Sequence, residues 1–189
     1  MSRRIGIVAG AFNPLTLAHT GLADAARAHV DEIVFAIPRA FPHKEFHGAS
    51  LDHRLEMLRA AGCSPRITEG GLYLEIARQI RDAEPASQVC LICGSDAAER
   101  IVNWNYASPD ALSRLFEEFQ LLVADRQGTY QPPAAFRHRI KSLALPAPLA
   151  DISSSEVRRR IAAREPWEHL VPESIVEFVR RIYSDRSLL

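Results

Sequence analysis

Short apolar, β-rich runs alternate with helix-like segments along the whole chain, and this alternation limits the folds that the chain can adopt. The runs expected as strands span residues 4–9, 32–37, 66–68, 88–93, 119–124 and 140–145. The segments expected as helices span residues 16–29, 50–61, 72–83, 108–118, 154–164 and 172–183. This order favours an α/β fold, a Rossmann-like doubly wound parallel sheet with helices on both faces. We therefore expect one domain over residues 1–189, with a helical C-terminal segment over residues 151–189.

The composition is that of an ordinary globular protein and argues against several classes. The 189 residues include 23 Lys and Arg and 23 Asp and Glu, so the formal net charge is zero. With 47% hydrophobic residues, intrinsic disorder is disfavoured, and so is a broad basic surface for nucleic acid. No apolar run approaches the roughly 20 residues that span a bilayer, and no convincing signal peptide opens the chain. We expect a cytoplasmic protein without a nucleic-acid or membrane partner, and the sequence leaves a homo-oligomer open.

The three cysteines, Cys63, Cys90 and Cys93, cannot build a full disulfide framework. Cys90 and Cys93 form a C-x-x-C inside an apolar run that is typical of a buried strand. Residues three apart on a strand point to opposite faces, so we expect buried structural thiols there. The histidines between residues 43 and 53 lack Cys or acidic partners at metal-ligand spacing, so no protein metal site is expected.

The loop after the first expected strand is the first candidate site, because open parallel sheets bind ligands at the carboxyl ends of their strands. Its sequence is Gly10-Ala11-Phe12-Asn13-Pro14-Leu15-Thr16-Leu17-Ala18-His19. Gly10 lets backbone approach a ligand, and the following helix start offers N–H groups to a phosphate. Thr16 caps that helix, binds a phosphate oxygen, or does both, and His19 lies one turn later. The loop matches neither G-x-G-x-x-G nor G-x-x-x-x-G-K-[ST], which disfavours ordinary dehydrogenases and P-loop NTPases.

A second candidate site opens the helix near the end of the chain. Its sequence is Asp151-Ile152-Ser153-Ser154-Ser155-Glu156-Val157-Arg158. The serines supply hydroxyls and backbone N–H groups to an anion, and the Arg158 fork one turn later suits polyphosphate. Taken alone, the same segment is also compatible with a plain N-cap followed by a solvated arginine.

The two segments together resemble the signature motifs of the nucleotidyltransferase superfamily, G-x-F-D-P-x-[HT]-x-G-H and I-S-S-T-x-I-R. Asn13 stands where the first motif has Asp, Thr16 where it has His or Thr, and Ala18 where it has Gly. Further segments resemble bacterial nicotinate mononucleotide adenylyltransferases of that superfamily: Pro42-His43-Lys44, His53-Arg54-Leu55-Glu56-Met57-Leu58, Gly94-Ser95-Asp96 with Asn103-Trp104, and Leu170-Val171-Pro172. The resemblance therefore covers nearly the whole chain, in order.

One segment departs from that family's pattern. Where the family carries S-Y-T-x-D-T, residues 72–77 keep Tyr73 but have Leu74 and Ile76 at the Thr and Asp positions. In the family this segment lies beside the nicotinate nucleotide, so the departure bears on the acceptor. Nicotinamide mononucleotide, phosphopantetheine or a cytidylyl-type substrate are alternative acceptors, and a degenerate member that binds nucleotide without turnover is the alternative of another class.

The resemblance implies adenylyl transfer from ATP to nicotinate mononucleotide, which gives deamido-NAD and pyrophosphate in NAD biosynthesis. The acceptor phosphate would attack the α-phosphorus in line without a covalent enzyme intermediate, so catalysis would rest on positioning and charge stabilisation. The resemblance implies that His19 donates to the α-phosphate and that Thr16 contacts a phosphate oxygen. It also implies that Lys44 reaches the polyphosphate or the acceptor phosphate, and that Arg158 binds the β- and γ-phosphates.

The other implied contacts divide between ATP and the acceptor. Residues implied to contact ATP are Gly10, Ala11, Phe12, Asn13, Gly94, Asp96, Ser153, Ser154 and Ser155. Tyr73 and Trp104 are implied to contact the acceptor, and Mg²⁺ is implied to enter with ATP rather than through a protein cage. Simpler readings stay open: Asp96 could cap the helix that it opens, Trp104 could belong to the core, His19 could be a helix-cap histidine, and Lys44 could be a solvated loop residue.

Overall fold

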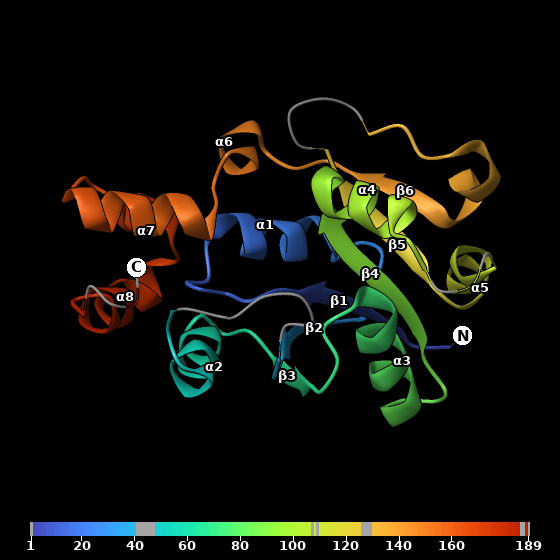
Figure 1. Ribbon diagram of the computed structural model, residues 1–189, viewed down its shortest axis with the longest axis horizontal. Coiled ribbons are helices and arrows are strands. Elements are labelled where there is room, and N and C mark those ends of the chain that lie inside the picture. Colours follow the sequence, from blue (N-terminus) through green and yellow to red (C-terminus); the bar gives the residue numbers. More distant parts are fainter. Residues whose placement is uncertain are drawn as a thin grey trace.

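The computed structural model of the chain centres on one six-stranded sheet in which each strand is parallel to its neighbours (Figure 1). In chain order the strands are β1 (Arg4–Ala9), β2 (Glu32–Pro38), β3 (Pro65–Thr68), β4 (Gln88–Gly94), β5 (Gln120–Ala124) and β6 (Ile140–Leu143). In space they follow the order β3-β2-β1-β4-β5-β6. The structure describes residues 2–40, 48–106, 108, 110–125, 130–185 and 188.

Two groups of helices pack on the two faces of the sheet. The first group is α1 (Leu17–Ala26), α2 (Leu51–Ala60), α7 (Ser154–Ala163) and α8 (Val176–Ile182). The second group is α3 (Tyr73–Ala83), α4 (Ser95–Asn103) and α5 (Ala111–Glu118). Successive residues of β1 supply the two cores in turn, since Ile7 packs in the second and Val8 in the first. The prediction of a Rossmann-like, doubly wound α/β fold is therefore confirmed.

The winding direction of the sheet reverses between β1 and β4, which pair side by side at its centre. From β1 the chain adds strands outward to β3 and then crosses back to begin the other half at β4 (Figure 1). The connections that leave β1 and β4 diverge at this point and open a crevice beyond their carboxyl ends. The fold therefore places the loop after β1 and the start of α4 at the usual ligand position of such sheets.

Cys90 and Cys93 lie on opposite faces of β4, as their spacing predicted. Cys90 belongs to the core of the first face and Cys93 to the core of the second. Burial raises the pKa of both thiols, that of Cys93 to about 12. The two thiols therefore stay protonated near neutral pH and point away from each other, which removes a joint metal or redox role.

Several element boundaries differ from the prediction. The first helix ends at Ala26 rather than at residue 29, and α4, which the sequence suggested only through Asp96 as a possible cap, begins directly after β4. Helix α5 begins at Ala111, after the N-cap residue Asp110, rather than at residue 108, and the expected last helix divides into η3 (Glu173–Ile175) and α8. Three short elements were not expected: η1 (Ala134–Arg139), α6 (Ala147–Ala150) and η2 (Glu168–Leu170).

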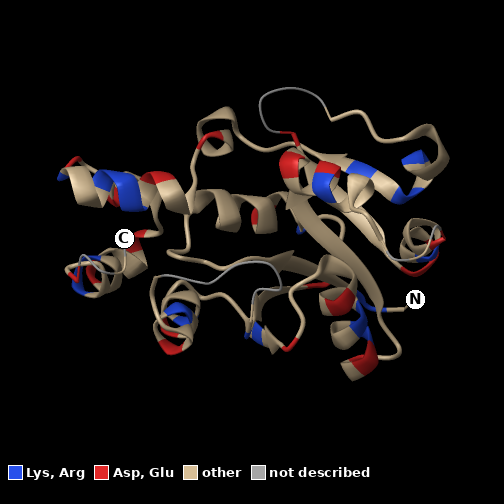
Figure 2. Cartoon of the chain, in the orientation of Figure 1, with Lys and Arg blue, Asp and Glu red and all other residues tan. Residues whose placement is uncertain are grey.

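Acidic and basic residues occur together on the outer helices, as Figure 2 shows for α3 and α7. One cluster joins α3 to α5, where Arg78 and Arg81 both pair with Glu118. The hydrogen bonds from these arginines hold the pKa of the Glu118 carboxyl below its usual range. Among the residues that the structure describes, no helix is long and apolar enough to cross a membrane.

Candidate active site

A cavity of about 190 Å³ opens at the carboxyl edge of the sheet, between the ends of β1 and β4. The polar side chains of its wall are those of His19, Tyr73, Asp96, Arg100, Ser153 and Ser154. The cavity lies where the winding of the sheet reverses, which is the position expected for a ligand. It brings a residue of the first sequence motif together with two residues of the second.

His19 lines this cavity, and its ring is oriented by the residues before it. The backbone N–H of Thr16 donates to His19 Nδ1 over 3.1 Å, and the Thr16 hydroxyl oxygen lies 2.8 Å from the same nitrogen. The ring of Phe12 packs edge-on against the imidazole, with 5.1 Å between the ring centroids. Because Nδ1 accepts a backbone hydrogen bond, the neutral ring carries its proton on Nε2. Nε2–H is therefore the group that can donate to an anion.

Thr16 does not reach the cavity surface. It occupies the N-cap position of α1 and its exposed fraction is 0%. A side chain without accessible surface cannot contact a phosphate, so the predicted phosphate contact of Thr16 is not supported. Its backbone and hydroxyl act on the His19 ring instead.

The rest of the first loop divides into buried and partly exposed residues. Phe12 and Asn13 are 1% and 4% exposed, so their side chains are buried, and a contact of these residues with ATP stays a prediction. Phe12 has φ 49°, a left-handed conformation that non-glycine residues seldom adopt, and its ring fills space against His19. Gly10 and Ala11 are partly exposed, so contacts between their backbone and a nucleotide stay a prediction.

Asn13 ties the loop to distant parts of the chain. Its Oδ1 accepts hydrogen bonds from the backbone N–H of Ala49, over 3.1 Å, and from the hydroxyl of Tyr183 near the C-terminus. Its backbone carbonyl accepts a hydrogen bond from Arg158. Burial raises the pKa of Tyr183, so the phenol stays protonated and donates. The loop that orients His19 is therefore held by α8 and α7.

The serines of the second motif begin α7 at the wall of the cavity. Ser153 is the N-cap, and its hydroxyl accepts a backbone N–H of the first turn over 3.1 Å. The hydroxyl of Ser154 donates to the carbonyl of Pro14 over 2.7 Å, so two motifs that are 140 residues apart meet directly. Ser155 is exposed, and its hydroxyl lies 3.5 Å from the Arg158 guanidinium.

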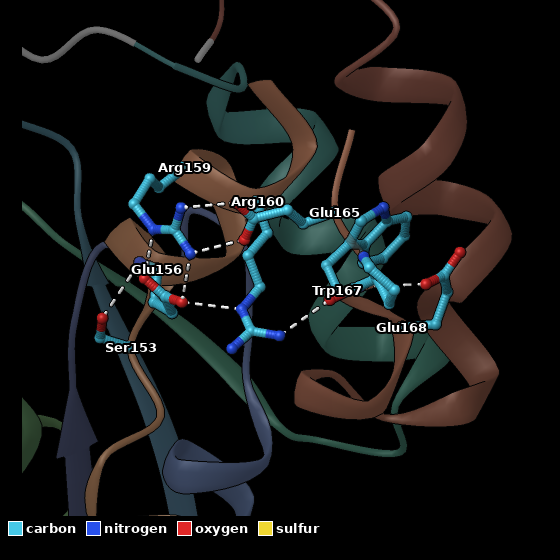
Figure 3. Close-up of polar contacts among 8 residues, drawn as sticks. Ser153, Glu156, Arg159, Arg160, Glu165, Trp167 and Glu168 are labelled. Carbon is cyan, nitrogen blue, oxygen red and sulfur yellow. Dashed lines mark hydrogen bonds and ion pairs between the residues drawn. The ribbon is translucent and has the colours of Figure 1, made fainter. Parts of the chain in front are cut away.

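Arg158 differs in its partners from the two arginines that follow it. Arg159 and Arg160 both pair with Glu156, over 2.8 and 2.7 Å (Figure 3). Arg158 instead donates to the Asn13 carbonyl, and within the described part of the chain it forms no ion pair with a carboxylate. Neutral acceptors therefore contact the positive charge of Arg158. A phosphate that binds there can take their place and accept stronger, charge-assisted hydrogen bonds.

A second pocket, of about 540 Å³, adjoins the cavity and shares Asp96 and Arg100 with it. The other residues of its wall are Glu99, Asn103, Trp104 and Asn105. Trp104 is 40% exposed, so the alternative that it is a core residue is wrong. Asp96 lies in the first turn of α4 behind the N-cap residue Gly94, so the alternative that Asp96 caps this helix is wrong as well. The pocket combines an indole face with charged groups.

Tyr73, at the start of α3, lines the same cavity as Asp96 and Arg100 of α4. Burial raises the pKa of Tyr73, so its hydroxyl stays neutral beside the Arg100 guanidinium. The structure thus brings Tyr73 and Asp96 into one cavity wall.

The predictions for Lys44 and for a metal site stand apart from those for the cavity wall. Pro42, His43 and Lys44 lie outside the described residues, so the role of Lys44 stays a prediction. Among the residues that are described, no group of three or more His, Cys, Asp or Glu is placed to hold a metal ion.

A model of one protein family matches residues 7–160, a range that includes both motifs and the whole cavity wall. The chain belongs to the cytidylyltransferase-like family. Two similar proteins bear the name "Probable nicotinate-nucleotide adenylyltransferase". That of Methylibium petroleiphilum is 32% identical over 97% of this chain and 91% of its own length, and that of Moorella thermoacetica is 28% identical over 94% and 89%.

Solved structures agree with this assignment at the level of the fold. The nicotinic acid mononucleotide adenylyltransferase of Plasmodium falciparum, complexed with NaAD, superposes with a TM-score of 0.74 and 16% identity, and covers 99% of this chain and 98% of its own. The cytidylyltransferase-like chain is thus a nucleotidyltransferase on a Rossmann-like sheet.

Two residues at the site of this nucleotidyltransferase, Arg100 and Tyr183, were not predicted from the sequence. Arg100 lies four residues after Asp96 and four before Trp104, so the helical periodicity of a helix opening near Asp96 is the signal that could have found it. Tyr183 carries no such signal, because its partner Asn13 is 170 residues away.

Proposed function

We infer that this nucleotidyltransferase transfers the adenylyl group of ATP to nicotinate mononucleotide, and that the products are deamido-NAD and pyrophosphate. The observation that carries this proposal is the convergence of His19, Ser153 and Ser154 on one cavity that opens into a pocket with an exposed Trp104. The names of the bacterial relatives support the same reaction, as does the NaAD bound to the Plasmodium falciparum structure.

In the proposed reaction an oxygen of the acceptor phosphate attacks the α-phosphorus of ATP in line. The bond from the α-phosphorus to the bridging oxygen breaks, and that oxygen leaves with the electron pair as part of pyrophosphate. Negative charge accumulates on the α-phosphate oxygens in the transition state, where the Nε2–H of His19 donates to one of them. No group of the protein forms a covalent bond, so the positions of the donors determine the rate.

Arg158 and the serines at the start of α7 bind the β- and γ-phosphates in this proposal. Arg158 exchanges the neutral Asn13 carbonyl for phosphate oxygens, which accept stronger hydrogen bonds from a guanidinium. Ser153 and Ser154 lie at the helix N-terminus, where backbone N–H groups add to the attraction for an anion.

Mg²⁺ enters as part of the MgATP substrate. Asp96 is the carboxylate of the cavity wall, and one carboxylate with substrate phosphates suits the ligand set that this ion commonly takes. Lys44 is predicted to reach the polyphosphate or the acceptor phosphate, where its positive charge would offset part of the negative charge of the substrates.

The test is pyrophosphate release from ATP with separate acceptors: nicotinate mononucleotide, nicotinamide mononucleotide and phosphopantetheine, and CTP with a phosphorylated alcohol as the cytidylyl pair. We expect release with nicotinate mononucleotide and a dinucleotide product by mass spectrometry. Release of pyrophosphate only with another acceptor would support nucleotidyl transfer but reject nicotinate mononucleotide as the substrate. Silence with every acceptor, together with measurable ATP binding, would instead indicate a nucleotide-binding protein without turnover.

A further inference from the structure

We propose that Arg100 binds the carboxylate on the pyridine ring of the acceptor and thereby makes the enzyme selective for nicotinate over nicotinamide nucleotides. This inference rests on the proposed function, because it concerns how the acceptor pocket chooses its substrate.

Arg100 lies on α4 where this helix borders both spaces. Asp96 and Arg100 are four residues apart on one side of the helix, and Trp104, four residues further on, is its C-cap residue. Arg100 and Asp96 line both the 190 Å³ cavity and the 540 Å³ pocket, whereas Trp104 lines the pocket alone. Arg100 therefore stands at the junction between the phosphate-binding cavity and the aromatic pocket.

The charges around this junction fit the two opposite charges of a nicotinate nucleotide. The ring nitrogen is a cation because it carries the ribose, and an exposed indole face such as that of Trp104 attracts a cation. The carboxylate of Glu99, in the same wall, favours that cation as well. Arg100 is the one Lys or Arg among the described residues that line either space, so it is the group there that suits the ring's carboxylate.

Tyr73 lies in the same cavity wall as Arg100 and does not neutralise its guanidinium. Burial raises the pKa of the Tyr73 hydroxyl, which therefore stays uncharged, and among the described residues Arg100 forms no ion pair with a carboxylate. A guanidinium has five N–H donors in a planar fork, and this fork can donate two parallel hydrogen bonds to a carboxylate.

The other cations of the facing helix α3, Arg78 and Arg81, pair with Glu118 and line neither space. Leu74 and Ile76 are apolar, and Ile76 is only 2% exposed. Glu75 caps its own helix by accepting the backbone N–H of Leu72 over 3.1 Å. On this side of the pocket, recognition of an acid group therefore depends on Arg100.

The experiment compares kcat/KM for nicotinate and nicotinamide mononucleotides in the native enzyme and in Arg100→Met. The two substrates share the phosphate and the pyridinium and differ only in carboxylate against carboxamide. We expect Arg100→Met to lose about 10- to 100-fold with the nicotinate substrate and little with the amide, since a charged hydrogen-bonded pair is lost. Arg100→Lys keeps the charge but loses the planar guanidinium fork. Its kcat/KM with the nicotinate substrate should therefore lie between those of the native enzyme and Arg100→Met.

Arg27→Met is the matched control, because Arg27 lies at the far end of α1 and pairs with Asp24 there. It should leave both substrates unchanged, and thermal unfolding should show that every variant folds. Equal losses with both substrates would mean that Arg100 binds a phosphate, and no loss would mean that it binds no part of the acceptor. Either result overturns the proposal.

Equilibrium binding separates this inference from the proposed function. If no turnover is found but the native protein still binds the nicotinate nucleotide more tightly than the amide, and Arg100→Met removes that difference, the reaction is wrong and the selectivity stands. If the native protein binds the two equally, the selectivity is rejected whatever the turnover.

Discussion

At the scale of single residues, the pairing of Thr16 with His19 determines which nitrogen of the imidazole carries the proton. The backbone N–H and the hydroxyl of Thr16 both approach Nδ1, within 3.1 and 2.8 Å. Thr16 is fully buried, so it acts on a substrate only through His19. It is a positioning residue, and its removal should cost less than removal of His19.

Thr16→Val replaces the hydroxyl with a methyl group of similar size and keeps the backbone hydrogen bond. We expect kcat to fall by about tenfold, because one of two contacts that orient the ring is lost, while KM for ATP stays unchanged. Steady-state kinetics measures both parameters. Thr16→Ser restores a hydroxyl and should recover most of the rate.

The same substitution in a His19→Ala background should have no further effect, since Thr16 would then have no ring to orient. A tenfold loss in both backgrounds would show that Thr16 acts on the substrate or on stability by another route.

Some residues of the site were predictable from the sequence and others were not. The spacing of His19 and of Ser153 and Ser154 relative to predicted strands and helices placed them at the correct edge of the sheet. The burial of Thr16 and Phe12 was not predictable. Both residues belong to a motif that also contains exposed residues, and no sequence pattern distinguishes the buried positions of the motif from the exposed ones.

At the scale of elements, α4 was the helix that sequence patterns indicated least clearly. Its N-cap position is Gly94, which also ends β4, so neither a turn nor a polar cap separates the two elements. The apolar spacing of Ala97, Ala98 and Ile101 against the second core is nevertheless helical. The elements with a recognisable cap, α2 after Ser50 and α7 after Ser153, began where they were expected.

The first turn of α7 carries an ion-pair network that affects acid stability. Hydrogen bonds from Arg159 and Arg160 lower the pKa of Glu156 from an ordinary value of 4.5 to about 2 (Figure 3). Folding therefore favours the ionised carboxylate. Its contribution to stability is present above about pH 4.5 and is lost as the pH falls from there toward 2.

Glu156→Gln should consequently lower the thermal midpoint near pH 6 and have a progressively smaller effect on approach to about pH 2. The network is accessible to solvent, so the difference between the two proteins should also shrink in high salt. Thermal unfolding over this pH range measures it, with Glu177→Gln, from the exposed Arg180 pair of α8, as the control. A constant difference at every pH would show that Glu156 acts through packing.

At the scale of the whole molecule, the two ends of the chain build one site. Tyr183 and Arg158 both bond to Asn13, and Ser154 bonds to Pro14, so the C-terminal helices hold the loop that positions His19. The sequence motifs predicted this convergence in outline, because both were expected at the carboxyl edge of the sheet, where ligands bind. The bonds that make it rigid join residues too distant in sequence for any local pattern to predict.

This arrangement also reconciles the zero net charge of the chain with the polyphosphate binding that we propose. The groups proposed to bind anions are few and lie at one edge of the sheet, while arginines elsewhere, such as Arg78, Arg81, Arg159 and Arg160, pair with carboxylates. The charge at this edge of the sheet can thus be positive although the net charge of the chain is zero.

The central claim is that the cavity beside His19 is where adenylyl transfer takes place, and the rate of pyrophosphate release by His19→Ala tests it most directly. With ATP and nicotinate mononucleotide at saturation, we expect kcat to fall by about 10²–10³, the usual cost of one transition-state donor. The fold, checked by thermal unfolding, should be unchanged. His138→Ala, from the exposed end of η1, should keep the native rate. A His19→Ala enzyme with near-native kcat would contradict the account.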